Sequence, residues 1–207
     1  MRISQKWLGV LAAVAVSGAQ AAAPVLSEGF DDVATLSAAG WIQSNVSTSP
    51  GQPWFQGNAG VFAAFDGASD SYIAANFLSS STETGAISNW LATPFMALPD
   101  GGTLSFYLRT EGDGFLDGVK VYINTTGSWA QQLAITSVPS TWTQYTVPVV
   151  ASSPVIQFGF EYSVASALDA NYIGIDSVLV TAVPEPASAV LLGLGLAGVW
   201  LRRRAAA

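Results

Sequence analysis

The side chains available for chemistry in this 207-residue chain are mainly carboxylates and aromatic rings. The sequence contains 14 acidic residues but neither histidine nor cysteine. Serine–histidine–aspartate and cysteine–histidine catalysis are therefore excluded, as is histidine-ligated zinc. Without disulfides, the chain must draw its stability from a core, with or without the help of a metal. The candidate sites are consequently carboxylate-bound cations and aromatic surfaces.

Two carboxylates, Glu28 and Asp176, form the candidate cation site. Asp176 interrupts an apolar segment at 172–180 that has the character of a strand, although aspartate is depleted in strands. First and last strands are often neighbours in β-sandwiches, so Glu28 is expected to approach Asp176. Two carboxylates with loop carbonyls suit Ca²⁺, which takes about six to eight oxygen ligands. In the alternative interpretation, Asp176 faces solvent and binds no ion.

The other polar groups give weaker indications of a site. Acidic, glycine-containing loops at 66–70 and 111–117 offer further oxygens, but the second lacks the order of an EF-hand, and solvated turns are the favoured interpretation of both. Glycoside hydrolysis needs only two carboxylates, yet no motif selects a pair. Lys120 and the serines form no Ser-x-x-Lys site. The sequence thus favours a protein that is not an enzyme.

Exposed tryptophans are the other candidate site, because their rings stack on the faces of pyranose sugars. Trp54 lies beside a proline in an expected loop, and Trp129 follows a Gly-Ser pair. These two residues are the candidates for a glycan-stacking surface, although burial is the favoured interpretation of each.

Short alternating segments must position these residues. In 103–108, 119–124 and 156–162 apolar side chains recur at every second position, as in strands with one buried face. Further strands are expected at 25–30, 41–46, 72–77, 87–98, 130–135, 143–149 and 172–180. Surface loops are expected at 44–60 and 79–85. About ten strands without helices predict an all-β fold, an antiparallel β-sandwich or jelly roll.

Several short motifs resemble the choice-of-anchor J domains, which are related to cleaved-adhesin and MAM-type jelly rolls. They are Glu-Gly-Phe-Asp at 28–31, Ala-Gly-Trp at 39–41, Trp-Leu-Ala-Thr-Pro-Phe at 90–95, Leu-Ser-Phe-Tyr-Leu at 104–108 and Ile-Gly-Ile-Asp-Ser-Val at 173–178. The resemblance implies an extracellular, adhesive β-sandwich without catalytic residues. It also implies that Trp41 and Trp90 belong to the core. Ser177 stands where the family's last-strand motif usually has asparagine.

The distribution of charge limits the partners of the body of the chain. All acidic residues except Glu185 lie between Glu28 and Asp176, whereas only Arg109 and Lys120 among the seven basic residues do. This stretch therefore has a net charge of about −11. Such a surface repels phosphate backbones, which excludes nucleic acid and favours divalent cations.

Both ends of the chain read as targeting segments. Residues 1–21 have the charged start, apolar centre and Ala-x-Ala site of a secretory signal peptide. The body is therefore expected at 22–182, followed by a tail at 183–207. In the tail, an uncharged segment at 187–201 precedes Arg202, Arg203 and Arg204.

Three interpretations of the tail compete. The G-x-G-x-x-G match at 193–198 lacks the strand, helix and acidic residue of a dinucleotide site, so it is accidental. A permanent anchor would need more than the ~22 Å that 15 helical residues span. Pro184, Glu185 and Pro186, a short apolar helix and the three arginines resemble the PEP-CTERM signal of Gram-negative bacteria. That resemblance implies transient anchoring in the inner membrane through a short transmembrane helix at 187–201, followed by removal of the tail by an exosortase.

Together these features predict an exported bacterial protein of the cell envelope, outer surface or extracellular matrix. Its expected role is that of an adhesive or structural module that contacts exopolysaccharide or other surface proteins. A carbohydrate-binding module that recognises the exopolysaccharide itself is the alternative, and a glycosidase is the least favoured.

Overall fold

The computed structural model describes residues 24–112, 114–125, 127–150, 153 and 155–183, together with eight positions between 193 and 204. Ala22–Val183 forms one compact unit, which we call the body. Within the described part of the chain, every buried hydrophobic side chain lies in the body, between Phe30 and Val180. The body therefore has a hydrophobic core of its own. The eight described positions of the tail are helical.

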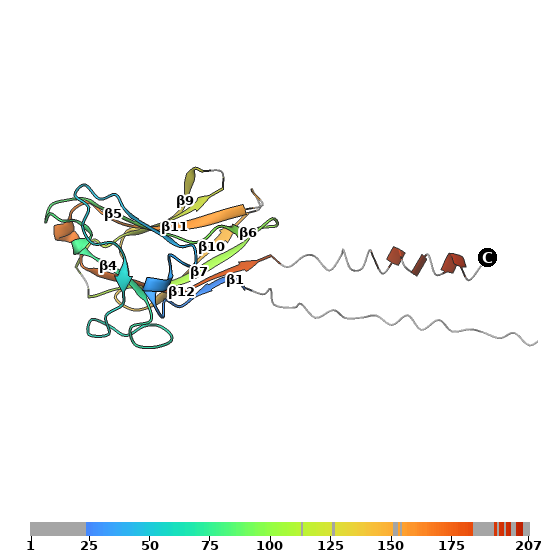
Figure 1. The fold of residues 1–207 in the computed structure, drawn as a ribbon, viewed down its shortest axis with the longest axis horizontal. Coiled ribbons are helices and arrows are strands. Elements are labelled where there is room, and N and C mark those ends of the chain that lie inside the picture. Colours follow the sequence, from blue (N-terminus) through green and yellow to red (C-terminus); the bar gives the residue numbers. More distant parts are fainter. Residues whose placement is uncertain are drawn as a thin grey trace, which may run out of the picture. The chain divides into compact units, whose positions relative to one another are not determined.

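The described residues of the body form two antiparallel sheets that pack face to face (Figure 1). The first sheet contains β1 (Pro24–Glu28), β3 (Phe55–Gln56), β4 (Ile73–Asn76), β7 (Gly102–Thr110), β10 (Thr143–Val149) and β12 (Tyr172–Ala182). The second contains β2 (Ile42–Asn45), β5 (Ile87–Ala92), β6 (Met96–Ala97), β8 (Val119–Asn124), β9 (Trp129–Ile135) and β11 (Val155–Val164). Short 3₁₀ helices occupy η1 (Val33–Thr35), η2 (Phe77–Ser79) and η3 (Ala167–Asp169). The predicted β-sandwich is confirmed.

The strand order places chain-distant segments side by side. The first sheet runs β10-β7-β12-β4-β3, with β1 also paired to β12, and the second runs β2-β5-β11-β8-β9, with β6 also paired to β11. Glu28 on β1 lies opposite Val178 on β12, so the expected pairing of the first and last strands is confirmed.

The alternation that predicted the strands also fills the space between the sheets. Leu104, Phe106 and Leu108 on β7 are fully buried, as are the even-numbered residues of β11 from Phe158 to Tyr162. On β11, however, Glu161 of the opposite face is also largely buried. A central strand covered on both faces loses the polar alternation that marks a one-sided strand.

Two details of the strands differ from the prediction. The segment 87–98 is two strands, because Pro94 has no N–H to continue the ladder and Thr93 donates its own N–H to the carbonyl of Phe158 at 2.9 Å. Within the predicted loop at 44–60, Phe55 and Gln56 form the short strand β3.

Residues 57–72 cover part of the outer face of the first sheet. Phe62 and Tyr72 pack there against Ala74 and Tyr172 in a second hydrophobic cluster. The guanidinium of Arg109 lies 4.5 Å from the centre of the Phe62 ring, a cation–π contact. The outer face of the first sheet is thus partly occupied by the protein's own loop.

Candidate functional site

The outer face of the second sheet presents a row of side chains that the cross-strand register aligns. Ser44 on β2 lies opposite Trp90 on β5, and Trp90 lies opposite Glu161 on β11. Lys120 on β8 lies on the other side of Glu161. Because alternate residues of a strand share a face, Tyr122 on β8 points the same way as Lys120.

Three aromatic rings gather on this face. The ring centre of Trp90 lies 4.7 Å from that of Tyr122 and 5.6 Å from that of Trp129 on β9. The Trp129 ring extends across β8 to β11, where it lies over Gly159. A methyl group added at Gly159 would come within 2.8 Å of this ring. The absence of a side chain at this one position therefore makes room for the indole.

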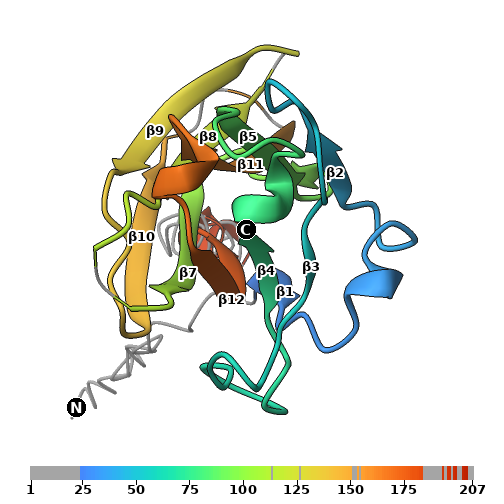
Figure 2. The same ribbon diagram turned by 90° about the vertical axis from the view of Figure 1, so that its left-hand side faces the viewer.

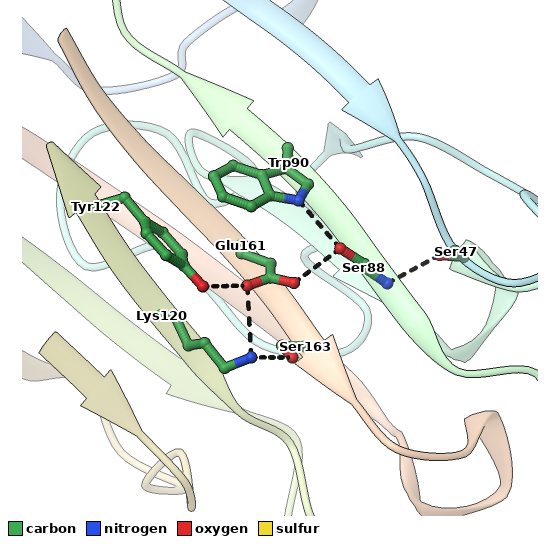
Figure 3. A network of polar contacts seen from close by, with 7 residues as sticks. All are labelled: Ser47, Ser88, Trp90, Lys120, Tyr122, Glu161 and Ser163. Atoms are coloured by element: carbon green, nitrogen blue, oxygen red, sulfur yellow. Dashed lines mark hydrogen bonds and ion pairs between the residues drawn. The ribbon is translucent and has the colours of Figure 1, made fainter. Parts of the chain in front are cut away.

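The Glu161 carboxylate fixes the positions of its neighbours (Figure 3). One oxygen accepts a hydrogen bond from the Ser88 hydroxyl at 2.7 Å, and the other accepts one from the Tyr122 hydroxyl at 2.7 Å. The Lys120 ammonium lies 3.5 Å from the second oxygen. The Trp90 indole N–H donates to the Ser88 hydroxyl oxygen at 3.0 Å. Glu161 thus holds Tyr122 directly and orients Trp90 through Ser88.

These contacts change the acidity of Tyr122. Burial of the hydroxyl, together with its hydrogen bond to the Glu161 carboxylate and the negative charge of that carboxylate, raises the pKa of Tyr122 to about 12. Tyr122 is therefore a neutral phenol at physiological pH, and its hydroxyl hydrogen stays on the bond to Glu161.

A groove of about 390 Å³ lies beside the aromatic rings. Its lining consists of Ile42, Ser44, Val46, Trp90, Ala92, Trp129 and Gln157. Ile42 and Val46 are more than half exposed, and Trp129 is 38% exposed. None of these lining residues is charged. The neighbouring Glu161 carboxylate is engaged by Ser88, Tyr122 and Lys120.

The groove and its aromatic rings have the chemistry of a sugar-binding surface rather than that of an ion site or a catalytic site. Indole rings offer flat apolar surfaces to the C–H faces of pyranose rings, and the few polar groups at the edges can accept or donate hydrogen bonds. The groove has no carboxylate in its lining, so the two-carboxylate chemistry of glycoside hydrolysis has no groups to use there.

The structure separates the two tryptophans that the sequence analysis proposed for stacking. Trp129 lines the groove, but Trp54 is buried, with only 2% of its surface exposed. The Trp54 indole N–H donates to the carbonyl of Asn89 at 3.2 Å, and its ring packs edge-on against Tyr162. Trp54 is therefore a core residue, so the favoured interpretation of burial is confirmed for it, and it does not belong to the candidate stacking surface.

Trp90 is the residue of the candidate site that the sequence analysis placed wrongly. It was assigned to the core with Trp41, which is indeed buried, but it lies partly exposed on the outer face. The alternation of side chains along a strand would have predicted its position. Ile87, Asn89 and Leu91 point inward, so Trp90 must point outward.

The carboxylate of Asp176 is fully buried and has a structural role, so the expected alternative of a solvent-facing side chain is wrong. It accepts hydrogen bonds from the backbone N–H groups of Phe65 at 2.7 Å and Asp66 at 3.2 Å, which tethers that loop to β12. Burial raises the pKa of Asp176, and these hydrogen bonds oppose the rise.

Glu28 and Asp176 have separate contacts. Glu28 accepts a hydrogen bond from the N–H of Phe30 at 2.7 Å. Across the described ranges, no three acidic side chains are grouped closely enough to hold a metal ion. Calcium binding at Glu28 and Asp176 stays a prediction.

The backbone next to Asp176 has an unusual conformation at Ser177. Ser177 has a φ of 50°, in the left-handed region, at a bulge between Asp176 and Leu179. This region is uncommon for residues other than glycine and asparagine. The Ser177 hydroxyl lies 3.2 Å from the Asp176 carboxylate and donates to it.

The acidic loop at 111–117 is not simply a solvated turn, as was expected. Asp117 is buried, and it accepts hydrogen bonds from the hydroxyls of Thr110 at 2.7 Å and Tyr162 at 2.6 Å and from the N–H of Asn171 at 2.9 Å. Burial, followed by the charge of Asp117, raises the pKa of Tyr162 well above its usual value. Asp117 therefore joins two loops to the core.

Lys120 and Ser163, which are 43 positions apart in the sequence, are in direct contact. The Lys120 ammonium donates to the Ser163 hydroxyl at 2.8 Å while it also pairs with Glu161. Lys120 on β8 thus contacts two residues of β11.

Most of the sorting tail lies outside the described residues. Pro184, Glu185 and Pro186 are among the positions that are not described, as is the expected signal peptide at 1–21. Arg202, Arg203 and Arg204 are helical. Among the described positions, the structure contains no helix with the length and apolar character that a membrane crossing requires.

Comparison with protein families identifies the tail. Residues 182–205 match the model of the PEP-CTERM protein-sorting motif. This match spans the Pro-Glu-Pro triplet, the apolar segment and the arginine cluster on which the predicted resemblance rested. The comparison with curated proteins found no matching relative.

Comparison with solved structures identifies the fold of the body. A cleaved adhesin domain of Lys-gingipain from Porphyromonas gingivalis is 25% identical, with a TM-score of 0.62, over 77% of this chain and 98% of that domain. A second such domain of the same protein is 22% identical, with a TM-score of 0.59, over 78% of this chain and 99% of that domain.

A carbohydrate-binding protein shares the fold at lower identity. The module TmCBM61, solved in complex with β-1,4-galactotriose, is 11% identical, with a TM-score of 0.54, over 78% of this chain and 99% of that chain. The chain thus combines a PEP-CTERM protein-sorting motif, which marks an exported surface protein, with a β-sandwich body that has the fold of cleaved adhesin domains.

Proposed function

We propose that this protein is an exported adhesive module that binds neutral polysaccharide through the groove beside Trp90 and Trp129. The observation that carries the proposal is the pair of indole rings, 5.6 Å apart at their centres, at the edge of an uncharged groove. Aromatic platforms of this kind provide sugar contact at low conformational cost, because each indole has only two rotatable bonds.

Charge favours neutral sugars over acidic ones. The body has a net charge of about −11, and the groove has no arginine or lysine in its lining to pair with a uronate or sulfate. Approach of a polyanion would therefore be repelled over long distances at low salt. The fold shared with TmCBM61, which was solved with a neutral trisaccharide, supports the same class of ligand.

Delivery to the surface follows from the two ends of the chain. We infer that a signal peptide at 1–21 exports the protein from a Gram-negative cell, and that the tail holds it briefly in the inner membrane until an exosortase removes the tail. The match of residues 182–205 to the sorting motif supports this order of events. The protein is then a substrate of that enzyme and has no catalytic activity of its own.

Binding is tested by affinity electrophoresis of the body in gels that contain one polysaccharide each. The panel comprises neutral β-linked galactan, glucan, xylan and mannan, together with polygalacturonate as the acidic comparison. We expect retardation by at least one neutral polymer and none by polygalacturonate. Trp129→Ala should weaken binding about tenfold or more, as removal of a central aromatic contact does.

Phe77→Ala is the matched control, because Phe77 is an exposed aromatic residue on η2, outside the groove. Equal losses in the two variants would assign binding to a different surface. If no polymer retards the body, the protein is a structural module without a glycan ligand.

Processing is tested separately by intact-mass spectrometry of the mature protein from cells that have the exosortase. We expect the mature protein to lack everything after about residue 185. Replacing Glu185 and Pro186 together with alanine should leave uncleaved precursor. Unchanged processing of that variant would contradict recognition of the Pro-Glu-Pro triplet.

A further inference from the structure

A second pocket lies on the same face of the second sheet as the aromatic groove. It has a volume of about 190 Å³, and its lining includes Lys120 on β8, Ala134 on β9, Ser163 on β11 and Asp169 in η3. Lys120 lies opposite Ala134, and residues directly opposite each other on paired strands point to the same side of the sheet. We call this cavity the Lys120 pocket.

One row of paired residues connects the groove with the Lys120 pocket. Ser44 and Trp90 line the groove. Lys120 and Ala134 line the pocket. Glu161 stands between them, and each residue of the row lies opposite the next on the adjacent strand. The row therefore crosses β2, β5, β11, β8 and β9 in that order (Figure 2). At the usual spacing of neighbouring strands it is ~19 Å long, which exceeds the length of a disaccharide.

The Lys120 pocket offers hydrogen-bonding groups that complement the apolar groove. The Lys120 ammonium has three hydrogens, and within the described residues it contacts only the Glu161 carboxylate and the Ser163 hydroxyl (Figure 3). The hydrogen of the Ser163 hydroxyl has no acceptor among the same residues. Asp169 is exposed, and no described residue donates to its carboxylate. Donors and an acceptor in one pocket match a sugar hydroxyl, which both donates and accepts.

The charges of the Lys120 pocket favour the same class of ligand as the groove. Glu161 balances the positive charge of Lys120, so the carboxylate of Asp169 leaves the pocket unfavourable to uronates, sulfates and phosphates. Between the groove and the pocket, the Glu161 side chain is only 10% exposed, and its carboxylate is already engaged. A chain that crosses this part of the face therefore meets little exposed charge.

We propose that a neutral polysaccharide seated on Trp90 and Trp129 continues along this row and places a further sugar in the Lys120 pocket, where Lys120, Ser163 and Asp169 bind its hydroxyl groups. The inference rests on the proposed function, because the groove supplies the first part of the site. It adds the length of the ligand: the protein recognises a stretch of polymer that is longer than a disaccharide.

Isothermal titration calorimetry of the body tests the second subsite with disaccharides and hexasaccharides of β-linked galactan, glucan, xylan and mannan. At least one hexasaccharide should bind about tenfold or more tightly than the disaccharide of the same sugar, because it occupies both parts of the site. Asp169→Ala should weaken hexasaccharide binding about three- to tenfold and leave disaccharide binding unchanged. The substitution keeps the backbone hydrogen bonds of residue 169 with Ser166 and Leu116.

Asp100→Ala is the matched control, because Asp100 is exposed and lines neither the groove nor the Lys120 pocket. Equal affinity for the two ligand lengths, or equal effects of Asp100→Ala and Asp169→Ala, would overturn the second subsite and leave the groove as the whole site. Trp129→Ala distinguishes this failure from that of the proposed function, since it should weaken binding of both lengths. Binding that Trp129→Ala does not affect, or no binding of any saccharide, would overturn the proposed function and the second subsite with it.

Discussion

At the scale of single residues, the buried carboxylates of this protein act as acceptors that fix other groups in place. Glu161 orients Tyr122 and Trp90, Asp117 joins two loops to the core, and Asp176 holds the loop at Phe65. Buried carboxylates are costly unless donors surround them, so each is well supplied with hydrogen bonds.

Replacement of Glu161 tests its role in positioning the aromatic rings. Glu161→Gln removes a negative charge beside the Tyr122 hydroxyl and turns one acceptor into a donor, so the pKa of Tyr122 should fall from about 12 towards its ordinary value. Glycan binding should weaken with it, and stability should fall by about 1–3 kcal/mol. Titration of the Tyr122 ring by NMR measures the first effect. Glu83→Gln, in an exposed loop, is the control, and an unchanged Tyr122 titration would exclude the proposed coupling.

Asp176 should make stability depend on pH in a defined direction. Its pKa is raised in the native state, so between the ordinary aspartate value of about 4 and the raised value the native state binds more protons than the unfolded chain. The free energy of unfolding should therefore fall as pH rises through this interval. Asp176→Asn keeps an acceptor for the loop and should remove this part of the slope. Urea unfolding of both proteins across the interval measures it, and identical slopes would contradict the account.

The same variant tests the prediction of calcium binding. If Glu28 and Asp176 bind Ca²⁺, a chelator should lower the melting temperature of the body by roughly 5–10 °C, and magnesium should not restore it. Asp176→Asn and Glu28→Gln should then abolish most of the difference. Equal melting temperatures with and without chelator would leave Asp176 as a loop acceptor alone.

At the scale of secondary-structure elements, periodicity predicted most of the strands because their inward faces are apolar. The approach of β1 to β12 was also predicted. The short strand β3 was not, because it depends on contacts with residues distant in the sequence. The break at Pro94 was not predicted either, although proline has no N–H for the ladder and its position could have indicated the break. For Trp54, burial was the favoured interpretation and is confirmed; its partner, the carbonyl of Asn89, is distant in the sequence and was not predicted.

The candidate site was harder to predict than the fold. Trp129 was named from the sequence, but the ring pair that it forms with Trp90 depends on the order β5-β11-β8-β9. Glu161 carried no signal of its own, since an acidic residue in an apolar strand is usually interpreted as solvent-facing. Alternation within β5 alone would have placed Trp90 on the outer face.

Gly159 gives a prediction at this scale. Gly159→Ala adds a methyl group that meets the Trp129 ring at 2.8 Å, so the indole must move away from β11. Glycan binding should weaken several-fold, while the core between the sheets is undisturbed because Gly159 faces outward. Gly29→Ala, where a methyl group meets nothing within 4 Å, is the control. Affinity electrophoresis measures binding, and full binding by the Gly159→Ala variant would show that the position of Trp129 is unimportant.

At the scale of the whole molecule, the body and the sorting motif differ in charge. The sorting motif at 182–205 contains Arg202, Arg203 and Arg204, whereas the body contains nearly all the acidic residues. An acidic body repels anionic polymers over long distances at low salt. The aromatic groove, which Trp129 of β9 helps to line, has no charged residue in its lining.

The most direct test of the central claim is an NMR titration of the body with the neutral polysaccharide fragment that binds best. The indole N–H signals of Trp90 and Trp129 should shift together and saturate at the same ligand concentration. Those of the buried Trp41 and Trp54 should stay unchanged. Binding that leaves Trp90 and Trp129 unaffected, or that shifts the signals of other tryptophans alone, would contradict the assignment of the groove as the glycan site.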